Sequence, residues 1–186
     1  MEIFASKIAA LMNRAAPRDL YDVYHMQKSN LFDESEKQLL RKCVMLYCAI
    51  ASENVPDTIS FDAVDQMSQN KIKTDLAPVL RRDEFFDLRK NREPVICGLT
   101  EFLVPEEKEQ RFWDAFKRKE YLPELLFDDP AILSRVSNHP MAVWKCSDRE
   151  RPSVRAELQN RARIAVDRLG EGQTTKLNPK KKIPER

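Results

Sequence analysis

Glycine is scarce in this sequence, with only three glycines in 186 residues. Glycine is the default residue of tight turns, so its scarcity argues against a fold built on many sharp reversals of the chain. Leu, Ala, Glu, Lys and Arg are abundant and favour helix, and no strand-like alternation of apolar and polar residues persists for more than a few positions. The sequence therefore predicts an all-α fold, a multi-helix bundle.

Signals for zinc binding, membrane insertion and export are also missing. The four cysteines, Cys43, Cys48, Cys97 and Cys146, have spacings that match no zinc signature, and Cys43 and Cys48 fall within an apolar helical run. No run of about eighteen apolar residues, the length of a membrane helix, occurs in the chain. The N-terminus is amphipathic and lacks a signal-peptide pattern. We expect a cytoplasmic protein with reduced core thiols and no membrane partner.

Apolar periodicity and capping residues divide the chain into two parts. We expect a helical domain over residues 1–170 and a disordered basic tail over 171–186. Asp33 and Glu36 form a capping-box pattern at the start of one long helix, and Pro94 is placed like the first residue of another. Helices are expected at 2–13, 18–28, 34–50, 61–67, 95–104, 105–116, 130–136, within 138–145, and at 151–169.

The first 28 residues combine an apolar stripe with charges of both signs. Lys7 and Arg14 are seven residues apart and so project from the same side of the first helix, while Asp19 and Asp22, three apart, share a face of the second. Lysine serves triphosphate sites as a point charge and arginine as a planar fork. The carboxylates could orient the lysine or help to hold a magnesium ion carried by a nucleotide. The pattern indicates a site for phosphate and a divalent metal.

A plainer interpretation of the same residues stays open. Arg18 and Asp22 have the spacing of an ion pair on one helix face, Asp19 suits a helix N-terminus, and Lys7 could be a solvated surface residue.

A second group of charges lies near the end of the chain. The net charge of +2 is too weak on its own to indicate nucleic-acid binding, but Arg155, Arg161 and Arg163 make the last predicted helix basic. They are candidates for binding an RNA acceptor. A solvated amphipathic helix followed by a cationic tail is the alternative.

The opening residues also resemble a known family. Glu2-Ile-Phe-Ala-Ser-Lys7-Ile-Ala-Ala-Leu-Met-Asn-Arg14, followed by Arg18-Asp-Leu-Tyr-Asp22, is similar to the third and fourth sequence blocks of the AbiEii/AbiGii toxin family. The segments 121–129 and 139–145 resemble the C-terminal helical region of these proteins, so the similarity runs from residue 2 to about residue 146.

The resemblance implies a bacterial nucleotidyltransferase toxin, related in fold to DNA polymerase β, of a type IV toxin–antitoxin or phage abortive-infection system. Such a toxin would move a nucleoside monophosphate from an NTP onto an acceptor, which we expect to be RNA, with the help of Mg²⁺. By this resemblance Lys7 would contact the nucleotide phosphates, Asp19 or Asp22 would complete the polar site, and Arg14 and Arg18 would support the charge.

The chain departs from the family pattern in one respect. Family members carry a Gly-Ser or Gly-Gly turn and an Asp-x-Asp pair before the lysine block, whereas the first glycine here is Gly98. We therefore expect the C-terminal half of such a protein, as a gene fragment, an isolated domain or one piece of a split enzyme. Its Mg²⁺ ligands would lie mostly in the missing N-terminal half, and this chain alone would have no measurable catalysis. Its partners would be that half or an antitoxin.

A non-enzymatic function is the alternative hypothesis. The chain would then be a helical module that binds a protein or RNA. An exposed apolar patch formed by Ile3, Phe4 and Ile8 would favour a protein partner or a homodimer.

Overall fold

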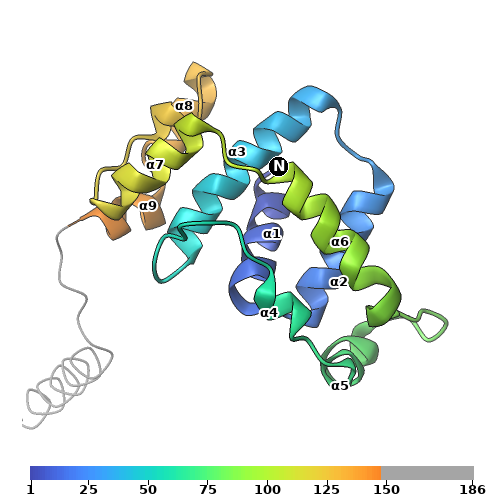
Figure 1. The fold of residues 1–186 in the computed structure, drawn as a ribbon. Helices are drawn as coiled ribbons and strands as arrows, with labels where there is room; N and C mark the ends of the chain where they lie inside the picture. Colours follow the sequence, from blue (N-terminus) through green and yellow to red (C-terminus); the bar gives the residue numbers. More distant parts are fainter. Residues whose placement is uncertain (148–186) are drawn as a thin grey trace, which may run out of the picture. The chain divides into compact units, whose positions relative to one another are not determined.

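A computed structural model describes residues 1–147, which form one compact unit. This part of the chain holds nine α-helices and no β-strand, so the predicted all-α fold is confirmed for it (Figure 1). None of its helices is long and apolar enough to cross a membrane. The predicted helix 151–169, the tail 171–186 and the candidate RNA-binding residues Arg155, Arg161 and Arg163 lie outside the described residues.

The first two helices form a tight antiparallel hairpin. α1 (Glu2–Arg14) ends at Ala15, whose φ of 46° is in the left-handed region, and α2 (Pro17–Ser29) begins with a proline. A left-handed residue closes a helix, and proline is suited to the first position of the next one because its missing N–H has no helical partner there. Two linker residues, Ala15 and Ala16, thus bring the charged residues of both helices face to face.

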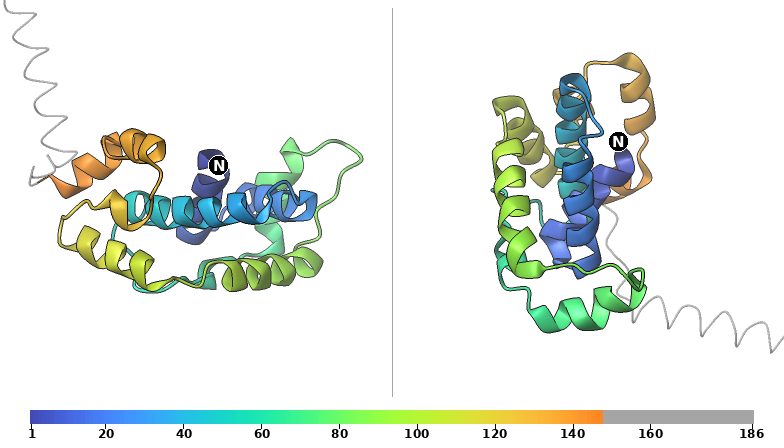
Figure 2. Two further views of the ribbon diagram at one scale, coloured as in Figure 1. Left: turned by 90° about the horizontal axis from the view of Figure 1, so that it is seen from above. Right: turned by 90° about the vertical axis from the view of Figure 1, so that its right-hand side faces the viewer.

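α3 (Glu34–Ala51) is the central helix of the core. Asp33 and Glu36 form the predicted capping box at its start, and it packs along α1. On its other side lies α7 (Glu107–Lys117), whose fully buried Trp113 donates a hydrogen bond from Nε1 to the Met45 carbonyl over 2.9 Å. α6 (Leu88–Phe102) and α7 follow one another along the same side of α2 and α3 (Figure 2).

Short elements complete the described unit. After α3 come α4 (Asp62–Asp65), α5 (Gln69–Lys71), a single π-turn (Ile72–Leu76) and a 3-10 turn (Ala77–Val79). After α7 come a 3-10 turn (Pro123–Leu125), α8 (Pro130–Val136) and α9 (Pro140–Cys146). Asp129 caps α8, which begins at Pro130 as expected, because the Asp129 side chain accepts hydrogen bonds from two backbone N–H groups of the first turn.

The predicted start of α6 is wrong. Pro94 lies inside this helix, which begins six residues earlier at Leu88. Asp87 supplies the actual N-cap, since its side chain accepts hydrogen bonds from the N–H groups of Arg89 and Lys90. Pro94 costs one backbone hydrogen bond there, but the cap and the buried apolar face, which includes Val95 and Leu99, keep the helix continuous.

The cysteines divide by burial. Cys43 and Cys48 are buried free thiols, as expected for core residues, whereas Cys97 is exposed and Cys146 is half-buried. Burial raises the pKa of Cys43 to about 11 and that of Cys48 to about 12.

The buried Cys48 thiol predicts loss of stability in alkali. Below pH 9, the ordinary pKa of cysteine, folded and unfolded chains both keep this proton; between pH 9 and 12 only the unfolded chain releases it, so unfolding becomes easier. By pH 11 the loss should be about 2 to 3 kcal/mol. Urea denaturation of Cys48→Ala from pH 8 to 11 should therefore show a flatter decline than that of the unchanged chain. The exposed Cys97→Ala variant is the control, and an equal flattening in both variants would contradict this account.

Candidate functional site

The α1–α2 hairpin brings together four of the predicted site residues. Lys7 and Arg14 of α1 face Asp19 and Asp22 of α2, and every contact among them is an ion pair between the two helices. Lys7 and Arg14 lie on the same side of α1, as expected, because both contact the Asp19 carboxylate.

Asp19 is the centre of the group. Its side chain is fully buried, and it accepts two hydrogen bonds from Arg14, one from Nε at 2.7 Å and one from Nη2 at 3.0 Å. Lys7 Nζ lies 3.6 Å from Oδ1 of the same carboxylate. The hydrogen bonds to Asp19 raise the pKa of Arg14 above its ordinary value. A buried carboxylate that holds two cations fixes the direction in which both point.

Lys7 and Asp22 form the solvent-facing pair of the site. Lys7 Nζ lies 2.8 Å from Asp22 Oδ2, and the two side chains are 38% and 42% exposed. The pKa of Lys7 is raised, mainly by the hydrogen bond to Asp22. Burial acts in the opposite direction and offsets part of this rise. An ammonium group has three N–H donors, so Lys7 keeps donor capacity for a further anion after contacting both aspartates. Arg14, at 64% exposure, likewise presents its remaining N–H groups outward.

Two other charged residues of this segment point elsewhere. Arg18 donates from Nε to the Asp75 carbonyl at 3.1 Å, so it joins α2 to the π-turn and does not pair with Asp22. Glu2, at the start of α1, pairs with Arg135 of α8 at 3.1 Å. The structure therefore does not bring Arg18 together with the other candidate residues.

A hollow begins beside the Lys7–Asp22 pair and runs between α1 and α2. Its volume is about 470 Å³, and it reaches His25 and Ser29 at the far end of α2. The rest of its lining is mainly apolar: Ile3, Phe4, Val23, Met26 and Leu31. Charged donors at one end of an apolar hollow can hold a ligand that has an anionic part and an uncharged part.

One residue of the predicted exposed patch of Ile3, Phe4 and Ile8 is not exposed. Ile3 is 74% exposed, but Ile8 is fully buried in the hydrophobic core. Phe4 is half-buried, and its ring packs edge-on against Phe32 with centroids 5.2 Å apart. The helical stripe that sequence periodicity detects is here largely the core face of α1, so it offers little support for a protein interface or a homodimer at that place.

Sequence reasoning missed a group of residues on the next face of α2. Tyr21 donates a hydrogen bond to Glu84, which, with burial, raises the pKa of Tyr21 to about 12. The His25 ring packs at a tilt against Tyr21, with centroids 4.3 Å apart, and its Nε2 lies 3.8 Å from Glu84. The segment 80–87 is thus attached to the helix that carries Asp22. The contact joins residues 63 positions apart, so no local sequence pattern predicts it.

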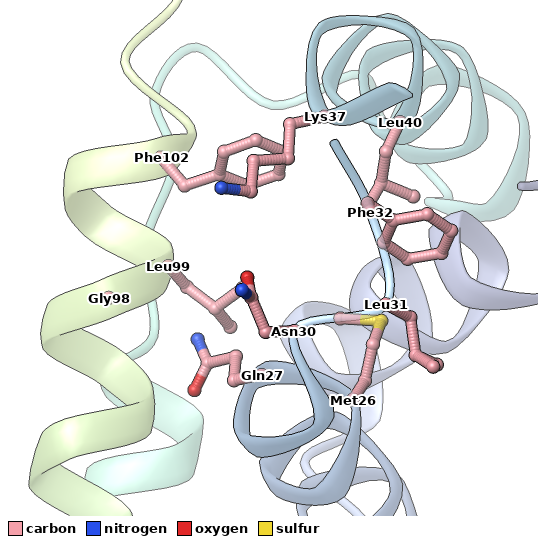
Figure 3. Close-up of a pocket in the computed structure, with 10 residues that line it drawn as sticks. All are labelled: Met26, Gln27, Asn30, Leu31, Phe32, Lys37, Leu40, Gly98, Leu99 and Phe102. Carbon is pink, nitrogen blue, oxygen red and sulfur yellow. The ribbon is translucent and has the colours of Figure 1, made fainter. Parts of the chain in front are cut away.

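A second hollow lies on the other side of α2, where the α2–α3 turn faces α6 (Figure 3). Its volume is about 390 Å³ and its lining is mostly apolar, with Lys37 as the one charged side chain. Gln27 reaches across to α6 and donates to the Val95 carbonyl at 3.2 Å, close to Gly98, where a Cβ would come within 3.0 Å of Gln27 Nε2. This hollow has one cation and no carboxylate, so it lacks the lysine–aspartate pair that lines the first hollow.

The described residues do not form a resident magnesium site. No group of three or more His, Cys, Asp or Glu side chains within residues 1–147 is placed to hold a metal ion. Both oxygens of Asp19 are already bound by Arg14, while Asp22 contacts Lys7 through Oδ2. Asp22 alone could offer an oxygen to a cation that arrives on a nucleotide.

Comparison with known proteins adds one finding. A family model described as nucleotidyl transferase AbiEii toxin, type IV TA system, matches residues 1–128. This range includes both helices of the Lys7–Asp22 site and the segment 80–87, and it ends before α8 and α9. No significant match was found among curated proteins or solved structures.

Proposed function

Because this chain belongs to the AbiEii nucleotidyl transferase toxin family of type IV toxin–antitoxin systems, we propose that its α1–α2 hairpin forms one wall of the nucleotide site. In this proposal Lys7 and Arg14 bind the phosphates of a nucleoside triphosphate, and a nucleoside monophosphate is transferred to an RNA acceptor. The family implies an antitoxin as the partner protein.

The observation that carries the proposal is the buried Asp19 carboxylate. It holds Arg14 and Lys7 by ion pairs while both cations keep donors on the solvent side, and Lys7 lines a hollow. Positioned positive charge is what phosphoryl-type transfer needs most, because charge spreads over the phosphate oxygens as the bond to the leaving group breaks. Asp19 is therefore a positioning residue, since it acts through the two cations and does not itself face the ligand.

The nucleoside would occupy the hollow next to Lys7. A triphosphate bound at Lys7 leaves its uncharged part beside the apolar lining that includes Val23 and Met26. Such a surface excludes water from one side of the ligand and strengthens the contacts of Lys7. We place the carboxylates that hold the catalytic Mg²⁺ ions outside residues 1–147, in another segment or another chain.

Asp22 distinguishes this proposal from simple electrostatic attraction. Without magnesium, Asp22 repels the phosphates and competes for Lys7, so Asp22→Asn should bind a nucleoside triphosphate about two- to fivefold more tightly than the unchanged chain. With magnesium the order should reverse, because the carboxylate is then an oxygen ligand for the cation on the nucleotide.

Isothermal titration of both proteins with and without Mg²⁺ measures this reversal. Asp62→Asn, an exposed aspartate of α4, is the matched control and should change neither affinity. A variant Asp22→Asn that shifts both affinities in the same direction would contradict the assigned position of the nucleotide.

A further inference from the structure

The segment 80–87, which we call the arginine loop, is held firmly at its end nearest α6. Phe86 is 2% exposed and packs edge-on against Tyr21 and Tyr24, with centroid distances of 5.6 and 5.5 Å. Glu84 accepts the hydrogen bond from Tyr21, and Asp87 caps α6. Three contacts within four residues fix the backbone of this part of the loop.

Phe85 points the opposite way from its buried neighbour. Its side chain is 79% exposed. No other large hydrophobic side chain among residues 1–147 is as exposed. Exposing a phenylalanine forgoes the stabilisation of burial, and here the anchored residues on both sides prevent the ring from turning inward. A rigidly presented aromatic face is suited to stacking on a planar ligand.

The loop and the start of α6 also carry exposed cations. Arg81, Arg82, Arg89 and Lys90 are all exposed, and among residues 1–147 none of them has an ion-pair partner. Residues 80–90 also hold three carboxylates, the exposed Asp83 and the hydrogen-bonded Glu84 and Asp87, so four cations against three anions leave this stretch a net charge of +1.

The arginine loop borders the proposed nucleotide site. Glu84 lies 3.8 Å from His25 Nε2, and His25 lines the same hollow as Lys7 and Asp22. A polymer bound along the loop would thus have an end within reach of the α1–α2 hairpin.

We propose that the arginine loop binds single-stranded nucleic acid of the RNA acceptor, with a base stacked on Phe85 and phosphates at Arg81 and Arg82. This proposal rests on the proposed function for the identity of the polymer as RNA. Unpaired bases can stack on an exposed aromatic side chain, while arginines contact the backbone whatever the sequence. A duplex hides its base faces, so an exposed aromatic ring favours a single strand.

Fluorescence anisotropy of the full chain with a labelled single-stranded RNA of about 16 nucleotides tests the proposal. Nucleotide and Mg²⁺ are left out, so the result does not depend on the Lys7 site. Phe85→Ala should weaken binding about tenfold and Phe85→Trp should restore it. In the double variant Arg81→Ala, Arg82→Ala, the slope of log affinity against log salt should become shallower by about 1.4.

Matched controls come from α7 and the turn before it. Val104→Ala removes another exposed apolar side chain, and Arg111→Ala removes another exposed arginine; neither should weaken RNA binding. The proposal is overturned if the controls weaken binding as much as the loop variants, if duplex RNA is equally sensitive to Phe85→Ala, or if a polyglutamate peptide binds with the same dependence on Phe85. A Lys7→Ala variant that keeps RNA binding but shows unchanged nucleotide affinity would reject the proposed function and leave the loop assignment intact.

Discussion

Asp19→Ala is expected to lower the free energy of unfolding by about 3 kcal/mol. The substitution removes two charge-assisted hydrogen bonds from Arg14 and an ion pair with Lys7 at a fully buried position, and each such bond contributes about 1.5 to 3 kcal/mol. The loss stays below the sum of these terms because Arg14 and Lys7 can turn to solvent once the carboxylate is gone. Urea denaturation at neutral pH measures it.

Asp22→Ala is the matched control for this prediction. Asp22 is on the same helix and also pairs with Lys7, but its side chain is 42% exposed, so its removal should cost at most about 1 kcal/mol. Equal losses in the two variants would mean that Asp19 does not organise the hairpin.

Lys7→Ala is expected to weaken binding of a nucleoside triphosphate by about ten- to a hundredfold. Hydrogen bonds to charged groups contribute about 1.5 to 3 kcal/mol, and the assignment gives Lys7 the direct contact with the phosphates. Stability should fall by less than about 1 kcal/mol, because both bonds from Arg14 to Asp19 remain. Isothermal titration measures the affinity, and thermal unfolding verifies the fold.

Lys37→Ala serves as the control for Lys7→Ala. Lys37 is the charged residue of the hollow beside α6 (Figure 3). Its substitution tests whether any lysine next to a hollow contributes to nucleotide binding. The assignment fails if Lys37→Ala weakens nucleotide binding as much as Lys7→Ala does.

Signals close together in the sequence predicted the part of the site that lies on the hairpin. The seven-residue spacing of Lys7 and Arg14 and the three-residue spacing of Asp19 and Asp22 are properties of single helices, and a two-residue turn leaves these helices few ways to pack. The Asp33 capping box was predicted correctly for the same reason, since it depends on residues three positions apart.

Features that depend on distant contacts were not predictable. Arg18 had an aspartate four residues away, yet it binds the Asp75 carbonyl 57 positions along the chain. The start of α6 was misplaced because Pro94 resembles the first residue of a helix, whereas the helix begins at Leu88, directly after the N-cap Asp87. The arginine loop depends on the pairing of Tyr21 with Glu84, which no spacing rule contains.

The most direct measurement is a map of amide chemical-shift changes in the ¹⁵N-labelled chain as a non-hydrolysable nucleoside triphosphate is added. If the α1–α2 hairpin is a wall of the nucleotide site, the largest changes will occur at Lys7, Arg14 and Asp22 and will be lost in Lys7→Ala. Largest changes around Lys37 and Gly98, with Lys7 unaffected, would contradict that assignment.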